Sequence, residues 1–197
     1  AVGLGAGSLA CYARPGETWR FYEIDPMVAR VAKDPSRFTF LSECAPQAPI
    51  ILGDARLKLA KADNGFYDLI VLDAFSSDTV PAHLMTREAL AMYMSKLTPE
   101  GVLLFHISNR YMELKNTLAR VVAAEGLSMR FADFSPDVSL ELRFVYAADV
   151  MMIARNEAVL DRLATDPMWT KVTVKPGRPW TDDYTNVLGA IIEKRFN

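Results

Sequence analysis

The chain has 197 residues, of which 51% are hydrophobic and 23% are charged, and its formal net charge is -2. This length suits one domain with a substantial core, and the composition is that of a globular protein. Because no run of five like charges occurs, neither a nucleic-acid-binding face nor a polybasic membrane patch is expected.

The two cysteines, Cys11 and Cys44, form no C-x-x-C pair and have no histidines close by in the sequence. This pattern argues against a disulfide scaffold and against a zinc site, and it favours a reducing compartment. No segment approaches the roughly 18 consecutive apolar residues that span a bilayer, and no signal peptide is visible. A cytoplasmic location without a metal is therefore expected.

The chain opens with Ala1 and Val2 directly before a glycine loop, without an initiator Met. A glycine loop of this kind needs a buried strand in front of it. We therefore expect residues 1–197 to form a single nucleoside-binding domain that is a fragment of a longer chain lacking its N-terminal region.

Short apolar runs alternate with amphipathic stretches, which indicates an α/β fold with a parallel sheet covered by helices. The run at 67–73 is almost continuously apolar, as in a strand buried on both faces, and 99–101 (PEG) predicts a turn. The predicted strands are 18–23, 49–52, 67–73, 102–107, 129–134 and 150–154, the last two antiparallel. The predicted helices are 26–33, 56–62, 84–97, 113–125, 157–164 and a last one ending near 194.

Ligands of open α/β sheets bind beyond the carboxyl ends of the strands, so the residues that follow each predicted strand belong together. Gly3, Gly5 and Gly7 follow the strand that is expected in front of the glycine loop, of which this chain holds almost nothing. Glycines let a backbone approach a ligand closely, and a helix after the loop would point its N–H groups at it. The third glycine of the dinucleotide-binding pattern would fall on Ser8, which weakens an NAD-binding interpretation.

Carboxylates follow the next two strands. Glu23 lies twenty residues beyond Gly3, where a carboxylate can accept hydrogen bonds from ribose hydroxyls; otherwise it is a solvated strand-end residue. Asp54 can accept a hydrogen bond from an adenine amino group, or it can simply be the N-cap of the helix from Arg56.

The strand at 67–73 is followed by a loop in which Asp73 and Asp78 flank Ser76 and Ser77. Such a composition is often only turn chemistry. In a half-desolvated cleft, however, a carboxylate can orient an amine and take its proton.

Other polar residues are weaker candidates. His106, Ser108 and Asn109 lie at the end of the predicted strand 102–107 and could line the cleft, although His106 can equally be a packed strand residue. The segment 181–184, with Asp183 and Tyr184, could contact a substrate, or it could cap the last helix.

Five segments, in this order and spacing, resemble the spermidine synthase family, and most closely the bacterial spermidine-synthase-like domains often fused to membrane-spanning segments. They are GLGAGS (3–8), FYEIDP (21–26), ILGDAR (51–56), VLDAFSSDTVP (71–81) and WTDDYTNVL (180–188). The resemblance implies a Rossmann-like class I methyltransferase fold. That fold has a mostly parallel seven-stranded sheet with helices on both faces and an antiparallel C-terminal strand.

The resemblance also implies roles for individual residues. The three loop glycines would cradle decarboxylated S-adenosylmethionine or S-adenosylmethionine, Glu23 would hold its ribose, and Asp54 with Ala55 its adenine edge. Asp73 would lie near the sulfonium, and Asp78 would be the base that activates the amine of a small polyamine such as putrescine. The implied substrate-binding residues are Ser76, Ser77, Asp78, Asp183 and Tyr184, and a homodimer is compatible with the resemblance.

Alternatives to aminopropyl transfer remain open at this stage. Spermidine synthases usually carry an acidic residue where this chain has Ala6, and methyltransferases usually carry one where it has Ala1. The alternatives are an S-adenosylmethionine-dependent methyltransferase, a non-catalytic nucleoside sensor of a membrane protein and, more distantly, an NAD oxidoreductase.

Overall fold

The computed structural model describes residues 1–74, 81–135 and 147–196. The chain divides into two compact units: unit 1 comprises Ala1–Asp63 with Val71–Ala74, and unit 2 comprises Asn64–Ile70 with Phe75–Asn197. In the described ranges, no helix combines the length and the apolar character needed to cross a membrane. The single domain over 1–197 stays a prediction.

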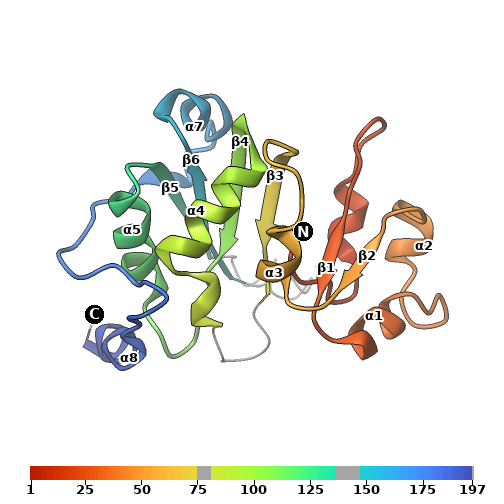
Figure 1. Ribbon diagram of the computed structural model, residues 1–197, viewed down its shortest axis with the longest axis horizontal. Helices are drawn as coiled ribbons and strands as arrows, with labels where there is room; N and C mark the ends of the chain where they lie inside the picture. Colours follow the sequence, from red (N-terminus) through yellow and green to blue (C-terminus); the bar gives the residue numbers. More distant parts are fainter. Residues whose placement is uncertain (75–80, 136–146, 197) are drawn as a thin grey trace. The chain divides into compact units, whose positions relative to one another are not determined.

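Unit 1 contains a two-stranded parallel sheet and short helices (Figure 1). The first α-helix begins as predicted, because Asp25 Oδ1 accepts the Met27 N–H at 2.7 Å and Pro26 occupies the first turn. The elements of unit 1 are η1 (a 3₁₀ helix, Ser8–Tyr12), β1 (Phe21–Glu23), α1 (Pro26–Ala32), α2 (Phe40–Cys44), β2 (Ile50–Leu52) and α3 (Ala55–Leu59). Its buried core cluster is Leu4, Ala10, Phe21, Ala29, Ala32 and Leu41.

Unit 2 contains most of a five-stranded sheet in the order β3-β4-β6-β5-β7. Val159 and Leu160 of α7 join the core cluster of Val102, Met152 and Ala154 on β4 and β6. The elements are β3 (Tyr67–Leu72, whose last two residues belong to unit 1), η2 (Ala82–Leu84), α4 (Arg87–Lys96), β4 (Leu97–His106), α5 (Leu114–Ala124), β5 (Ser128–Phe134), β6 (Ala148–Ala154), α7 (Glu157–Leu163), β7 (Trp169–Lys171) and α8 (Val187–Phe196).

The expected seven-stranded, mostly parallel sheet is wrong in detail. The described strands form a two-stranded and a five-stranded sheet, and the pairs β4–β6, β5–β6 and β5–β7 are antiparallel. In place of a first strand, Val2 alone forms isolated parallel bridges with Tyr22 and Leu72. The next residue, Gly3, has a φ of 88°, which ends the extended conformation.

Three local expectations also fail. Leu69 of β3 is 41% exposed, so this strand is not buried on both faces. Residues 99–101 continue β4 instead of forming a turn, and the helix after the glycine loop is only the short η1. Helix α2 and strand β7 were not anticipated, because each is too short to show a hydrophobic period.

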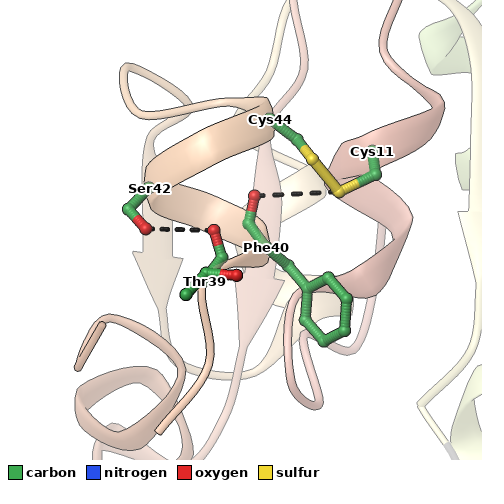
Figure 2. Close-up of a disulfide and its surroundings, with 5 residues drawn as sticks. All are labelled: Cys11, Thr39, Phe40, Ser42 and Cys44. Atoms are coloured by element: carbon green, nitrogen blue, oxygen red, sulfur yellow. Dashed lines mark hydrogen bonds between the residues drawn. A yellow bond between two sulfur atoms is a disulfide. The ribbon is translucent and has the colours of Figure 1, made fainter. Parts of the chain in front are cut away.

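Cys11 and Cys44 form a disulfide (Figure 2). The sequence pattern argued against a disulfide scaffold, and this bond contradicts that interpretation. Their separation of 33 residues carries no motif. The fold brings them together because Ala10 of η1 and Leu41 of α2 share the core of unit 1.

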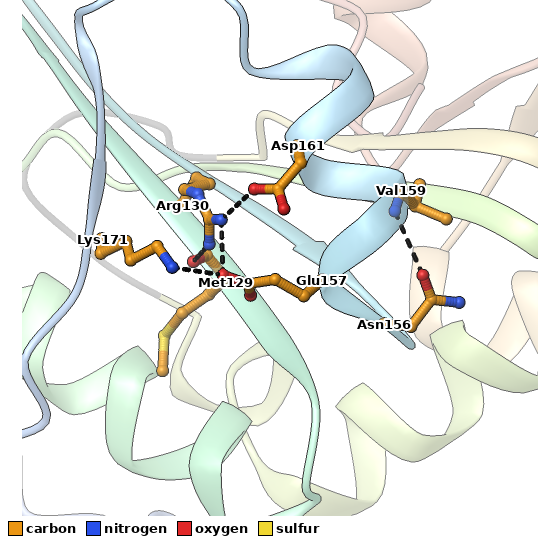
Figure 3. A network of polar contacts seen from close by, with 7 residues as sticks. All are labelled: Met129, Arg130, Asn156, Glu157, Val159, Asp161 and Lys171. Atoms are coloured by element: carbon orange, nitrogen blue, oxygen red, sulfur yellow. Dashed lines mark hydrogen bonds and ion pairs between the residues drawn. The ribbon is translucent and has the colours of Figure 1, made fainter.

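Arg130 of β5 is buried and holds β5, α7 and β7 together (Figure 3). Its Nη2 donates to Glu157 Oε1 at 2.6 Å and to Asp161 Oδ1 at 2.5 Å. Lys171 Nζ of β7 lies 2.9 Å from the same Glu157 oxygen. Hydrogen bonds from Arg130 and Lys171 lower the pKa of Glu157 to about 2.

This pKa predicts a specific dependence of stability on pH. Because the folded-state pKa of Glu157 is depressed from 4.5, its stabilising contribution is present above about pH 4.5 and lost as the pH falls toward 2. The side chain is 44% exposed, so the contribution is about 1 kcal/mol or less. In urea unfolding, Glu157→Gln should be less stable than wild type at pH 6, with a smaller difference at pH 3.

The exposed Glu43 provides a matched control. Glu43→Gln should change the unfolding midpoint little at either pH. A Glu157→Gln deficit that is equal at pH 3 and pH 6 would contradict the assigned titration.

Candidate nucleoside-binding site

Backbone hydrogen bonds fix the start of the glycine loop between β1 and the end of β3. The Val2 N–H donates to the Val71 carbonyl at 2.7 Å, and the Asp73 N–H donates to the Val2 carbonyl at 2.8 Å. The Gly3 N–H donates to the Tyr22 carbonyl at 2.9 Å. The first residues of the glycine loop are therefore hydrogen-bonded to the backbone at the carboxyl ends of β1 and β3.

The three loop glycines have different surroundings. A Cβ on Gly3 (φ 88°) would lie 2.0 Å from the Asp73 carbonyl oxygen, and one on Gly7 (φ 86°) would lie 2.8 Å from Leu41 Cγ. A Cβ on Gly5 (φ 53°) would have no atom within 4 Å. Gly3 and Gly7 are thus required by packing within unit 1, whereas Gly5 borders open space where a ligand can approach.

Glu23 ends β1 and is only 8% exposed. Its Oε2 accepts the Leu4 N–H of the glycine loop at 2.9 Å, and its Oε1 accepts the Asp25 N–H at 2.9 Å. These bonds compensate the buried charge and fix the carboxylate plane. Each carboxylate oxygen can accept a further hydrogen bond, so Glu23 keeps capacity for ribose hydroxyls.

Asp54 follows β2 at the same edge as Glu23. The Gly53 N–H donates to the Glu23 carbonyl at 2.9 Å, which ties the two strand ends together. Asp54 Oδ1 accepts the Leu57 N–H at 2.9 Å, so Asp54 is the N-cap of α3, and Ala55 is the first residue of that helix. The N-cap interpretation is confirmed, while contact with adenine stays a prediction for both residues.

Asp73 directly follows β3 and is exposed beside Gly3. The structure thereby places Gly3, Glu23, Asp54 and Asp73 at the ends of neighbouring segments of unit 1. Ser76, Ser77 and Asp78 lie outside the described residues, and their predicted roles stay predictions.

Exposed apolar side chains accompany the carboxylates, and the sequence interpretation missed them. Ile24, directly after Glu23, is 70% exposed, and Leu57 in the first turn of α3 is 66% exposed. Ligand sites commonly combine apolar walls with a few polar groups, and an adenine ring needs such walls. The available signal was the apolar residue that follows a strand-end carboxylate.

Unit 2 has its own polar cluster at the end of β4. His106 Nε2 and Ser108 Oγ lie 2.8 Å apart, and Ser108 Oγ accepts the Asp149 N–H at 2.7 Å. Burial, with a smaller effect of Asp133 on the neighbouring strand, raises the pKa of the Asp149 carboxyl. A cavity of about 240 Å³ adjoins this cluster; its lining includes Ser108, Asn109, Arg110, Ala147, Ala148 and Asp149. The structure therefore places the weaker candidates His106, Ser108 and Asn109 together.

The segment Thr181–Tyr184 forms a tight turn, in which the Thr181 N–H donates to the Tyr184 carbonyl at 2.8 Å. The turn is attached to α4, since Thr86 Oγ1 donates to Asp182 Oδ1 at 2.7 Å. It does not cap α8, where Asn186 Oδ1 accepts the Gly189 N–H at 2.9 Å.

Asp183 and Tyr184 sit on this turn in different environments. Asp183 is exposed, and the Arg178 guanidinium lies 3.9 Å from the centre of the Tyr184 ring. This cation–π contact holds the Tyr184 ring. A substrate role for either residue stays a prediction. Within the described ranges, no group of three or more His, Cys, Asp or Glu residues could hold a metal ion.

These features define the class of fold, an α/β Rossmann-like methyltransferase fold with polar residues at the strand ends. Solved structures of the same class cover most of the chain. The human methyltransferase-like protein 13 in complex with SAH has a TM-score of 0.56 and 21% identity, and covers 93% of this chain and 84% of that one. A probable spermidine synthase from Corynebacterium glutamicum ATCC 13032 has a TM-score of 0.61 and 17% identity, covering 86% of this chain and 64% of that one.

The predicted resemblance to the spermidine synthase family is confirmed. The chain is 36% identical over 107 residues to a polyamine aminopropyltransferase of Vibrio vulnificus (strain CMCP6). The aligned region covers 52% of this chain and 34% of that protein. A spermidine synthase in complex with the transition state analogue AdoDATO has a TM-score of 0.55 and 14% identity, covering 96% of this chain and 62% of that one. The chain therefore spans about a third of the length of the Vibrio vulnificus protein. No protein-family model matches it.

Proposed function

We propose that this chain carries the nucleoside-binding part of an aminopropyltransferase. The donor would be decarboxylated S-adenosylmethionine, and the acceptor a small polyamine such as putrescine. The observation that carries the proposal is Glu23, a buried carboxylate pre-oriented by the loop amide of Leu4 and adjoining exposed apolar side chains. The similarity to a polyamine aminopropyltransferase supports the choice of reaction.

The described residues fit such a donor. Gly5 leaves open space at the loop, Glu23 retains lone pairs for hydroxyl groups, and Ile24 offers an apolar surface. When bound, the sulfonium donor supplies the carbon that an amine attacks in line, with methylthioadenosine as the leaving group. The chain would contribute positioning, exclusion of water and removal of the amine proton. Asp73 beside the loop and Asp78 as the base remain the proposed catalytic residues.

A methyltransferase using intact S-adenosylmethionine is the second candidate. The specific observation in its favour is the fold shared with methyltransferases, one of them solved with SAH. The start of the chain favours neither function, since Ala6 replaces the usual acid of spermidine synthases and Ala1 that of methyltransferases. The two functions differ in whether the donor keeps its carboxylate, so donor affinity discriminates between them.

Calorimetric titration tests the proposal directly. Methylthioadenosine and decarboxylated S-adenosylmethionine should bind more tightly than intact S-adenosylmethionine and NAD. Glu23→Gln should weaken binding about 10- to 100-fold, since it replaces a charge-assisted hydrogen bond to the ligand. Asp25→Asn is the matched control: it removes a nearby charge but keeps an N-cap oxygen, so affinity should change little.

Each other outcome has a definite meaning. Tighter binding of intact S-adenosylmethionine would transfer the proposal to the methyltransferase. If no adenosyl ligand binds, the nucleoside site is refuted. If ligands bind, turnover with putrescine that Asp78→Asn abolishes would support catalysis, whereas no turnover by the parent would favour a sensor.

A further inference from the structure

The Cys11–Cys44 disulfide joins η1 to α2 within unit 1 (Figure 2). Both cysteine residues are exposed. A cavity of about 500 Å³ opens beside Cys44, with Arg14, Trp19 and Gln47 in its lining. A dithiol reductant can therefore reach the sulfur atoms without unfolding the chain.

The disulfide joins η1 and α2, the two short helices that contact the glycine loop. Helix η1 carries Cys11 and has the loop residue Gly7 as its N-cap, while α2 ends at Cys44. Leu41 of α2 occupies the space next to Gly7, where an added Cβ would lie 2.8 Å from Leu41 Cγ. Leu4 of the loop belongs to the same buried cluster as Leu41.

These helices have little stability of their own. Each contains five residues, too few for a helix to persist in water without tertiary support. The side chain of Thr39, the N-cap of α2, makes no capping hydrogen bond. Ser42 Oγ donates to the Thr39 carbonyl at 3.0 Å. Their positions consequently depend on mutual packing and on the covalent link.

The packing of η1 and α2 also affects Glu23, the residue proposed to bind the ribose. The Leu4 N–H donates to Glu23 Oε2 at 2.9 Å, so the loop position and the carboxylate orientation are linked. If α2 and η1 separate, Leu4 and Gly7 lose their packing partner Leu41. The loop amides and Glu23 would then have to be ordered when a ligand binds, which costs affinity.

We propose that Cys11 and Cys44 form a redox-responsive pair that sets the affinity of the glycine loop for its nucleoside. This inference rests on the proposed nucleoside site. A thiolate of a dithiol reductant attacks one sulfur, the S–S bond breaks, and a mixed disulfide forms. The second reductant thiol then displaces the cysteine, leaving two cysteine thiols and the oxidised cyclic reductant. The oxidised chain is the high-affinity state.

The test compares methylthioadenosine affinity in the oxidised and the dithiothreitol-reduced protein by calorimetry, with far-UV circular dichroism recorded on both. Reduction should weaken binding about tenfold, within the usual range of coupling between sites, with the dichroism retained. Reoxidation with oxidised glutathione should restore the affinity. The double variant Cys11→Ser/Cys44→Ser is the matched control, and it should bind as weakly as the reduced chain and ignore dithiothreitol.

Hydrogen exchange keeps the inference separate from the proposed function. If the oxidised chain binds no adenosyl ligand, the nucleoside proposal fails; faster exchange of the Leu4 amide on reduction would still support redox control of the loop. Equal affinity and equal Leu4 exchange in both states would overturn the inference. Loss of the circular dichroism signal on reduction would also overturn it, because the bridge would then be purely structural.

Discussion

Gly3→Ala should lower the free energy of unfolding by about 4 kcal/mol or more, a large fraction of the about 5 to 15 kcal/mol of a typical domain. An alanine Cβ at this position would lie 2.0 Å from the Asp73 carbonyl oxygen. That oxygen belongs to backbone and cannot rotate away as a flexible side chain would. The φ of 88° adds a conformational penalty for any residue with a Cβ. Urea unfolding followed by circular dichroism measures the effect.

Gly5→Ala separates the two causes. Gly5 also has a positive φ, 53°, but a Cβ there would have no atom within 4 Å. Only the conformational penalty applies, so the expected loss is about 1 kcal/mol. Equal destabilisation by the two substitutions would contradict the crowding assigned to Gly3.

Removing the disulfide is expected to lower the free energy of unfolding by about 3 to 4 kcal/mol. The bridge closes a loop between residues 33 positions apart, and the loss of this restraint favours the unfolded chain. A domain with a stability in the usual range of about 5 to 15 kcal/mol would still remain folded. The measurement is urea unfolding of Cys11→Ser/Cys44→Ser beside the wild type.

Reduced wild type should show the same midpoint as the double variant. Ser42→Ala, on the same helix α2, is the control and should change the free energy of unfolding by less than about 1 kcal/mol. Coincident unfolding curves for oxidised and reduced wild type would refute the predicted stabilisation.

Features that depend on neighbouring residues were predictable from the sequence. Asp25 and Pro26 start α1, and Asp54 starts α3, because capping involves atoms only two or three residues apart. The antiparallel pairing of β5 and β6 was also predicted. The disulfide and the number of parallel strands were not, because both depend on contacts between distant segments.

The same distinction applies to the candidate site. The carboxyl ends of strands meet at one edge, which allowed Glu23, Asp54 and Asp73 to be selected from the sequence. Which glycine borders open space could not be predicted, because Leu41 and the Asp73 carbonyl come from elsewhere in the chain. For the same reason, the exposure of Ile24 and Leu57 became apparent only in three dimensions.

Unit 1 is discontinuous in the sequence, since its last piece, Val71–Ala74, comes after the first piece of unit 2. Val71 and Asp73 supply the backbone partners of Val2, so this piece cannot be omitted. A single genetic crossover between residues 63 and 64 could therefore not transfer unit 1 intact to another protein.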